Sequence, residues 1–216
     1  PSVTDDSDIG LWEMVVHELA IKAKIMVPNA FVKKLTSHYH TYLSQRFDRT
    51  EDTKRIHFAS AMTLLQHKDG DDADSGVSYL DLVRFIKSEC ADVTANLEEL
   101  FRRVLFSVCI SNTDDHLRNH GFLYTKAGWT LSPAFDLNAN ETGTGLKLNS
   151  DEVDNSLDID LVMSTSPYYL LSDKRAGKIK EEVTKAVSDW RKVAARHNIS
   201  PSEIERKASA FRTFHF

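Results

Sequence analysis

Three side chains in the middle of the chain are of the types that phosphoryl transfer requires. Asp114 and Asn119 stand five positions apart, and Asp136 follows further along. In-line transfer needs a carboxylate that orients the attacking hydroxyl and accepts its proton, and it needs oxygen ligands that hold Mg²⁺ against the nucleotide phosphates. One carboxylate as base, with an amide and a second carboxylate as metal ligands, would meet this requirement.

The spacing decides which of two adjacent aspartates is the base. Protein kinases place the catalytic Asp five positions before a metal-binding Asn, and they carry a second metal-binding Asp further on, in D-F-G. Only Asp114 has an Asn at the fifth position. Asp114 is therefore the predicted base, Asp115 is a neighbour that caps the turn, and Asp136 takes the place of the second metal-binding Asp.

The chain between the two motifs must return to its starting point if these side chains are to share a site. Residues 121–124 and 129–131 are rich in strand-forming residues and enclose Lys126-Ala127-Gly128, which predicts a β-hairpin with a glycine-containing turn. A hairpin runs out along one strand and back along the next. It therefore explains how both motifs can face one cleft.

The rest of the chain supplies the elements that position this cleft. Apolar residues at three- and four-residue steps predict a helix over 11–23, and alternation predicts strands over 30–35 and 38–47 that could pair. The other predicted helices cover 58–66, 78–89, 94–110, 157–164, 173–197 and 201–213. The predicted fold class is α+β, with a small β-containing segment and hinge over 1–48 and a mainly helical lobe over 49–216.

The composition narrows the function class. With 216 residues, 41% of them hydrophobic and 27% charged, the chain has an ordinary globular composition. No apolar run approaches the ~20 residues of a membrane span. A net charge of −5 argues against tight, sequence-independent nucleic-acid binding, which depends on Lys and Arg.

Cys90 and Cys109 lie in apolar helical patterns, so we expect buried thiols rather than a disulfide.

Longer stretches around the predicted site have a distinctive pattern. They read Thr113-Asp114-Asp115-His116-Leu117-Arg118-Asn119-His120-Gly121-Phe122, Leu131-Ser132-Pro133-Ala134-Phe135-Asp136-Leu137 and Gln45-Arg46-Phe47-Asp48-Arg49. Together they resemble the signature of HipA-like serine/threonine kinases, the toxins of bacterial type II toxin–antitoxin systems. The third stretch is similar to the family's E-R-F-D-R segment, with Gln45 in place of Glu. The resemblance covers nearly the whole chain.

The resemblance implies a lobed kinase that uses ATP and Mg²⁺ and phosphorylates a Ser or Thr hydroxyl. It implies that Asp114 is the catalytic base and that His116 supports the loop. The residues that it assigns to the nucleotide and its metal are Gln45 and Phe47, through backbone groups at adenine, and Asn119 and Asp136, as magnesium ligands.

The resemblance also implies partners and a location. The parent protein would be a cytoplasmic toxin that phosphorylates a translation component, such as an aminoacyl-tRNA synthetase. A HipB-like helix-turn-helix antitoxin would restrain it and would be its only link to DNA, and no membrane partner is expected. The family's ATP-binding lysine and phosphate loop lie upstream of Pro1, so we expect this chain alone to transfer phosphate slowly.

Two other functions remain open. His116 and His120 are four residues apart and, with Asp136, could hold a transition metal in a hydrolase. Alternatively, the chain could be an interaction module that docks an antitoxin and has lost catalysis. If it is a kinase, Glu13 or Glu18 on the first helix could pair with the ATP-binding lysine.

Overall fold

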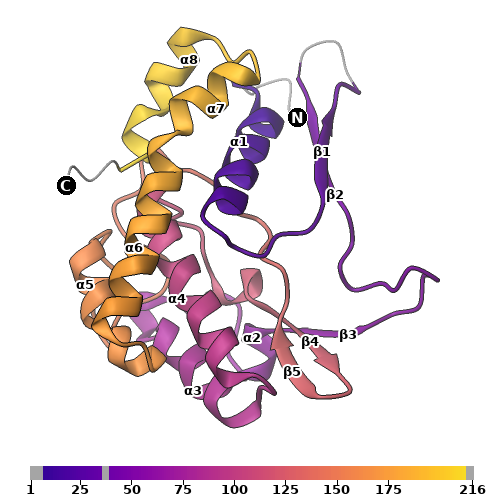
Figure 1. Ribbon diagram of the computed structural model, residues 1–216, viewed down its shortest axis with the longest axis vertical. Helices are drawn as coiled ribbons and strands as arrows, with labels where there is room; N and C mark the ends of the chain where they lie inside the picture. Colours follow the sequence, from indigo (N-terminus) through magenta and orange to yellow (C-terminus); the bar gives the residue numbers. More distant parts are fainter. Residues whose placement is uncertain (1–6, 36–38, 213–216) are drawn as a thin grey trace.

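In the computed structural model, which describes residues 7–35 and 39–212, helices make up most of the regular secondary structure and strands form two small antiparallel sheets (Figure 1). The predicted α+β class is confirmed. The helices are α1 (Ile9–Lys22), α2 (Ala61–Leu64), α3 (Tyr79–Glu89), α4 (Val93–Cys109), α5 (Ile159–Ser164), α6 (Asp173–Ser188), α7 (Trp190–Arg196) and α8 (Pro201–Arg206). The strands are β1 (Ala30–Lys33), β2 (Thr41–Ser44), β3 (His57–Ser60), β4 (Gly121–Thr125) and β5 (Gly128–Leu131), and the 3₁₀ turns are η1 (Ala73–Ser75), η2 (Leu117–Asn119), η3 (Ser166–Tyr169) and η4 (Lys207–Ala210).

The first sheet is the predicted hairpin of β1 and β2, which stands beside α1 (Figure 1). A Cβ atom on Gly10 would lie 2.3 Å from the carbonyl oxygen of His40, so the glycine allows the helix to approach the strand closely. Asp8 caps α1 by accepting a hydrogen bond from the Leu11 N–H (3.2 Å), and it also accepts one from the His40 N–H (3.1 Å). Residue 38, the predicted start of the second strand, lies outside the described residues.

The second sheet has the order β3-β4-β5. The hairpin predicted between the two acidic motifs is confirmed, whereas the helix predicted over 58–66 is wrong in its first part. Residues 57–60 form β3, in which Phe58 lies opposite Leu123, and α2 begins only after Ser60. The backbone of β3 pairs with a strand that is distant in the sequence, and local periodicity carries no information about such a partner.

Helix α4 runs through the middle of the helical body (Figure 1) and is buried over much of its length. The side chains of Leu97, Phe101 and Leu105 are fully buried. Cys90 and Cys109 are both buried and unpaired, as predicted. Burial raises the pKa of each thiol to about 12, so neither is a reactive thiolate at neutral pH.

The helix predicted over 173–197 is two helices, because the chain bends at Asp189 between α6 and α7. Asp189 accepts a hydrogen bond from the Lys22 ammonium on α1 (2.6 Å). The bend places Trp190 against Phe211, with stacked rings 4.4 Å apart, and against Trp12 of α1. The last predicted helix is also shorter, since α8 is followed by η4 and residue 213 lies outside the described residues.

The start of α1 is held by the carboxylate of Glu203 in α8. One oxygen of Glu203 accepts hydrogen bonds from the Asp8 N–H (3.0 Å) and from the Trp12 indole N–H (2.8 Å). Ser200 caps α8 by accepting a hydrogen bond from the Glu203 N–H. The first helix and the last helix of the described chain are thus joined through one side chain.

The end of α1 is held by a buried charge pair between α4 and α6. Arg102 is 3% exposed, donates to Glu182 (2.8 Å) and donates to the carbonyl oxygen of Ala23 (2.9 Å). Lys24 also donates to Glu182 (2.7 Å). Burial disfavours the ionised carboxylate, but Lys24 and Arg102 outweigh it and lower the pKa of Glu182 to about 2.

We predict that Glu182→Gln lowers the free energy of unfolding by roughly 3 kcal/mol at pH 7, because it removes the carboxylate 2.8 Å from buried Arg102 and leaves this guanidinium with the more distant carboxylate of Glu98 (3.7 Å). The pKa of Glu182 is lower in the folded protein than its ordinary value of 4.5. The ionised carboxylate therefore stabilises the fold above pH 4.5, and this stabilisation is lost as the pH falls toward 2.

Urea unfolding of the parent and the variant at several pH values measures this difference. Glu181→Gln, at the exposed neighbouring position, is the matched control and should unfold like the parent. Equal stability of the two glutamine variants at pH 7, or a loss that does not shrink at acid pH, would contradict the prediction.

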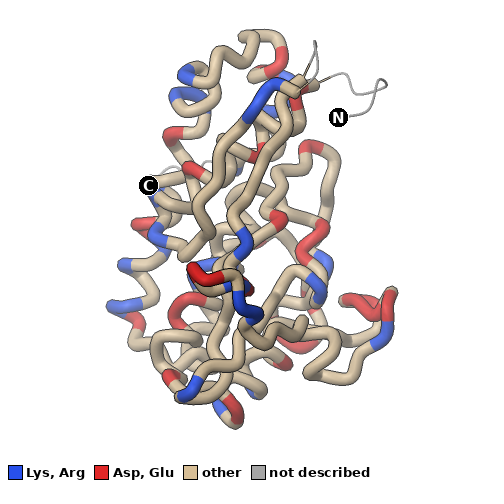
Figure 2. The backbone as a smooth tube through the Cα atoms, turned by 90° about the vertical axis from the view of Figure 1, so that its right-hand side faces the viewer, with Lys and Arg blue, Asp and Glu red and all other residues tan. Residues whose placement is uncertain are grey.

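Charged residues of both signs alternate along the chain. Figure 2 shows Lys and Arg interspersed with Asp and Glu along the described backbone on the side that it displays. This distribution agrees with the net charge of −5 and does not favour a basic face for nucleic acid. Within residues 7–35 and 39–212, none of the helices combines the length and the apolar character that a membrane span needs.

Candidate active site

The loop after α4 holds Asp114 and Asn119 in a fixed relation. The carbonyl oxygen of Asp114 accepts hydrogen bonds from the His116 N–H (2.9 Å) and from the side-chain amide of Asn119 (3.1 Å). Among the described residues, no hydrogen bond engages the amide oxygen of Asn119, and no hydrogen bond or ion pair engages the carboxylate of Asp114. The loop therefore leaves one carboxylate and one amide oxygen available to ligands.

Asp115 lies on the opposite side of this loop, and its predicted role as a turn cap is wrong. It is 3% exposed and accepts hydrogen bonds from the hydroxyls of Tyr79 (2.7 Å) and Ser107 (3.1 Å). Its other oxygen lies 3.1 Å from Nε2 of His120. Burial disfavours its ionised form, but His120 and the two hydroxyls outweigh burial and lower the pKa of Asp115. Asp115 is thus an anchor in the core, whereas Asp114 is exposed.

Asp136 is positioned by the segment that follows β5. Arg103 donates to the carbonyl oxygen of Ser132 (2.8 Å), and the Ala134 N–H donates to the carbonyl oxygen of Met26 (2.7 Å). The first bond ties the segment to α4, and the second ties it to the connection between α1 and β1. Asp136 itself is exposed and has a φ of 57°, a left-handed conformation that is unfavourable for residues with a Cβ atom. Asn138 donates to its carboxylate (2.9 Å).

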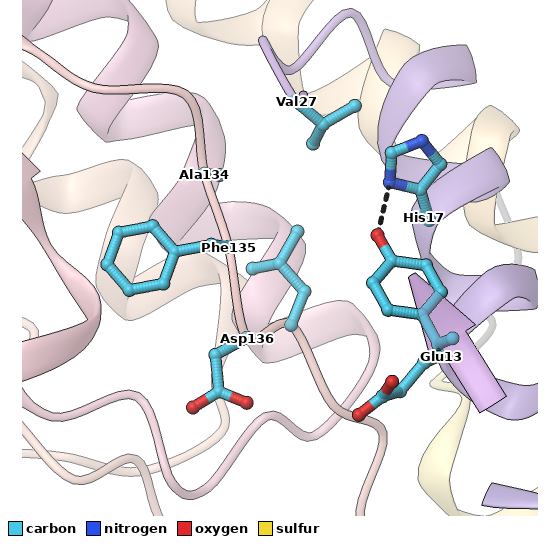
Figure 3. A pocket seen from close by; sticks show the side chains of 8 residues that line it. Glu13, His17, Val27, Ala134, Phe135 and Asp136 are labelled. Atoms are coloured by element: carbon cyan, nitrogen blue, oxygen red, sulfur yellow. Dashed lines mark hydrogen bonds between the residues drawn. The ribbon is translucent and has the colours of Figure 1, made fainter. Parts of the chain in front are cut away.

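Asp136 lines a pocket together with α1 and β2 (Figure 3). Figure 3 shows Glu13 on the helical wall and Asp136 on the loop wall. Tyr42 of β2 also lines this pocket, and its hydroxyl is hydrogen-bonded to Nδ1 of His17 (2.9 Å). Burial, and next the nearby charge of Asp136, raise the pKa of Glu13. The pocket therefore has an acidic end that favours a cationic ligand.

Asp114 lies in an adjoining pocket. The lining of this second pocket includes Asn112, Thr113 and Asn140, and Glu13 lines both this pocket and the pocket of Asp136. Thr113 accepts a hydrogen bond from Asn140 (2.7 Å), so the chain after Asp136 packs on the loop that carries Asp114. Asp114 and Asp136 thus open onto two neighbouring pockets beside the same helix.

The predicted adenine-contacting segment adjoins this site through three aromatic rings. Phe47 lies 5.9 Å from Phe58 and 5.5 Å from Phe135, between ring centroids. A Cβ atom on Gly121 would lie 2.3 Å from the Phe58 ring, so the glycine leaves room for this cluster. The cluster links the segment after β2 directly to the residue before Asp136.

The backbone of this segment is partly engaged. The Gln45 N–H donates to the carbonyl oxygen of Asn29 (2.8 Å), so it is not free to meet a nucleotide. Among the described residues, the carbonyl oxygen of Gln45 and the N–H of Phe47 have no partner. Asp48 binds Arg46 and Arg49 (2.6 Å each), and the hydrogen bond from Arg46 is the main cause that lowers the pKa of Asp48 to about 2.

The alternative metal site is not formed. Within the described part of the chain, no three His, Cys, Asp or Glu side chains are arranged to hold a metal ion. His120 is 2% exposed, faces Asp115 and packs edge-on against the Tyr79 ring. The prediction that His116 and His120 join Asp136 at a transition metal is therefore wrong, because His120 faces the core.

The two glutamates of α1 have different surroundings. Glu18 binds Arg196 (2.5 Å) and His197 (2.7 Å) and so holds α1 to α7. Glu13 lies in the cleft. The pocket residues His17 and Tyr42 were not predicted. His17 follows Glu13 by four residues and shares its helical face, a signal that was available, whereas nothing local marks which side of β2 meets the cleft.

A hairpin and helix beside a helical body, with an Asp-x-x-x-x-Asn loop and a Phe-Asp pair where they meet, define a kinase-like domain. The chain belongs to the HipA-like C-terminal domain family, whose model matches residues 2–196. This match confirms the family resemblance of the sequence motifs.

Individual relatives agree with this assignment. A presumed kinase of Haemophilus influenzae is 33% identical over 101 residues, which are 44% of this chain and 29% of that protein. HipA of Shewanella oneidensis MR-1, solved with HipB and operator DNA, has a TM-score of 0.74 at 18% identity over 95% of this chain and 54% of its own. The proinflammatory kinase CtkA of Helicobacter pylori has a TM-score of 0.55 at 11% identity, over 88% and 87% of the two chains.

These matches differ in what they show. At such identities the two solved structures show the fold alone. The chain spans about half of the Shewanella HipA chain and less than a third of the Haemophilus protein.

Proposed function

We propose that this chain forms the catalytic region of an ATP-dependent serine/threonine protein kinase, in which Asp114 is the general base. The observation that carries the proposal is the contrast between two adjacent aspartates. Asp115 is buried and fully engaged, whereas Asp114 has an unengaged carboxylate beside the cleft. Asp114 would orient a Ser or Thr hydroxyl and accept its proton as the hydroxyl oxygen attacks the γ-phosphorus and the bond to ADP breaks.

Oxygen groups on the loop of Asp114 and on the segment after β5 suit Mg²⁺. The amide oxygen of Asn119 is unengaged, and the exposed carboxylate of Asp136 accepts one hydrogen bond, from Asn138. Mg²⁺ prefers hard oxygen ligands and commonly takes only one or two from the protein, together with phosphates and water. Bound there, the ion would neutralise charge on the phosphates. Asn119 and Asp136 are the ligands that we propose.

The unpaired backbone groups after β2 suit adenine. The Gln45 carbonyl oxygen can accept a hydrogen bond and the Phe47 N–H can donate one, which is the pair of groups that an adenine edge requires. The contact of Phe47 with Phe135 would place the base near the loop that carries Asp136. His116 would support the loop that carries Asp114. Its Nδ1 atom is buried and has no hydrogen-bond partner among the described residues.

A kinase site also needs a cation that grips the phosphates. Among the described residues, the lining of the Asp136 pocket includes no Lys or Arg. Kinases pair such a lysine with a helix glutamate, and the raised pKa of Glu13 is consistent with an acid that lacks this partner. We propose that Glu13, not Glu18, receives a lysine from another part of the whole protein.

The partners of the whole protein follow from the family. We propose a protein substrate, with a translation component such as an aminoacyl-tRNA synthetase as the first candidate. We also propose a HipB-like antitoxin, since the related Shewanella HipA was solved with HipB and operator DNA. A cytoplasmic location would suit both partners.

Phosphate incorporation from γ-labelled ATP tests the proposal in the complete gene product. We expect Mg²⁺-dependent labelling of Ser or Thr, and we expect Asn119→Ala to lower kcat/KM for ATP by roughly 100-fold, because a metal ligand is lost. Antitoxin binding without any labelling would instead support the interaction module. Full labelling by Asn119→Ala would show that the metal assignment is wrong.

A further inference from the structure

The acid beside the proposed base is buried at a cost that packing alone does not explain. Transfer of a carboxylate into a protein interior is unfavourable unless hydrogen bonds compensate for the lost water. Asp115 has such compensation, from the Tyr79 and Ser107 hydroxyls and from the nearby His120 ring. An apolar residue of similar size would avoid the cost, so the network must contribute something other than burial.

The three partners of Asp115 come from three separate elements. Tyr79 is the first residue of α3, Ser107 lies near the end of α4, and His120 immediately precedes β4. Contacts from three directions fix the position of Asp115 more closely than contacts within its own loop could. Asp114 immediately precedes Asp115 in the chain, so the position of its Cα atom is restricted as well.

The same loop carries the proposed metal ligand. Asn119 donates to the carbonyl oxygen of Asp114, and His116 donates to the same oxygen. Displacement of Asp115 would therefore move the base and one metal ligand together. By contrast, the unpaired backbone groups proposed for adenine lie on the segment after β2, which the Asp115 network does not touch.

We propose that Asp115 and Tyr79 are positioning residues for phosphoryl transfer, which aim the Asp114 carboxylate at the cleft. The inference rests on the proposed kinase function. Tyr79 is suited to this role because it is fully buried, its backbone N–H is bound to the carbonyl oxygen of Asn149 (2.9 Å), and its ring packs edge-on against His120. The hydroxyl that meets Asp115 is thus itself rigidly held.

Tyr79→Phe tests the inference, because it removes the hydroxyl and keeps the ring. In the complete gene product we expect kcat to fall roughly tenfold, since small displacements of catalytic groups have large effects on rate. The KM for ATP should change by less than about twofold, because ground-state binding through the segment after β2 is left intact. A purely structural role would lower the amount of folded enzyme without this separation of kcat from KM.

Tyr169→Phe is the matched control. Tyr169 is also fully buried, it lies near enough to influence the pKa of Tyr79, and its hydroxyl has no partner among the described residues. Tyr169→Phe removes a hydroxyl from the same part of the core, as Tyr79→Phe does, and its kcat should stay at the parent value. If Tyr79→Phe does not fold, as judged by circular dichroism, Ser107→Ala removes the other hydroxyl and carries the same expectation.

The outcomes separate the inference from the function on which it rests. If the parent has no kinase activity, or if Asp114→Asn retains it, the proposed function fails. If Asp114→Asn is inactive but folded Tyr79→Phe, or its substitute Ser107→Ala, turns over like Tyr169→Phe, only the positioning role is overturned. A selective loss of kcat in Tyr79→Phe supports both.

Discussion

Replacement of Asp114 by Asn should lower phosphoryl transfer by the complete gene product roughly 1000-fold, which lies within the range for loss of a general base. The amide keeps the shape of the side chain but cannot accept the proton of the substrate hydroxyl. The fold should be unaffected, because the carboxylate is exposed and none of the described residues binds it. The free energy of unfolding should therefore stay within about 0.5 kcal/mol of the parent.

Steady-state kinetics and urea unfolding of the same preparation measure both parts of this prediction. Asp160→Asn is the matched control, since Asp160 is an exposed aspartate on α5, outside the pockets around Asp114 and Asp136. It should retain full transfer. Transfer at the parent rate by Asp114→Asn would remove the general-base assignment, and a large loss of stability would mean that the side chain has a structural partner.

Asp136→Gly should abolish transfer and at the same time make the protein more stable. We expect at least a 1000-fold loss of kcat/KM, because a metal ligand is removed. The free energy of unfolding should rise by about 0.5–1 kcal/mol, since glycine adopts a left-handed backbone without strain, an advantage only partly offset by its greater freedom in the unfolded chain. Asp136→Gly also removes the negative charge near Glu13, and the loss of this repulsion should further raise the free energy of unfolding.

Asn198→Gly provides the control for the backbone effect. Asn198 has the same φ of 57° in the connection between α7 and α8, far along the chain from the cleft. It should show a similar or smaller gain in stability with unchanged transfer. An active Asp136→Gly would contradict the metal assignment, and a destabilised one would mean that the carboxylate supports the fold.

The candidate site residues could be named from the sequence because the pattern that marks them is local. The interval between Asp114 and Asn119 selected the first aspartate, and the hairpin between the motifs followed from turn and strand residues. The burial of Asp115 could not be predicted, because its partners Tyr79 and Ser107 come from other helices. Local sequence reports which groups can do chemistry, but their neighbours depend on tertiary packing.

The wrong predictions of helices and strands have the same cause, which is that tertiary contacts cannot be read from local sequence. Residues 57–60 form a strand because β4 provides hydrogen-bond partners for their backbone. The apolar residues keep a helical spacing on both sides of Asp189, which predicted one helix, but the chain bends there and brings Trp190 to Trp12. The choice between Glu13 and Glu18 also required the structure, since it depends on where α7 lies. The division of the chain at residue 48 stays a prediction.

The contact of Glu203 with Asp8 and Trp12 has a consequence for protein synthesis. The helix that carries Glu13 precedes Glu203 and Phe211 in the chain, so it is made before the residues that hold its start. A nascent chain that has not yet reached α8 lacks the Glu203 clamp and the Phe211 ring that stacks on Trp190. The start of this helix is therefore held by its full set of contacts only after α8 and Phe211 have been translated.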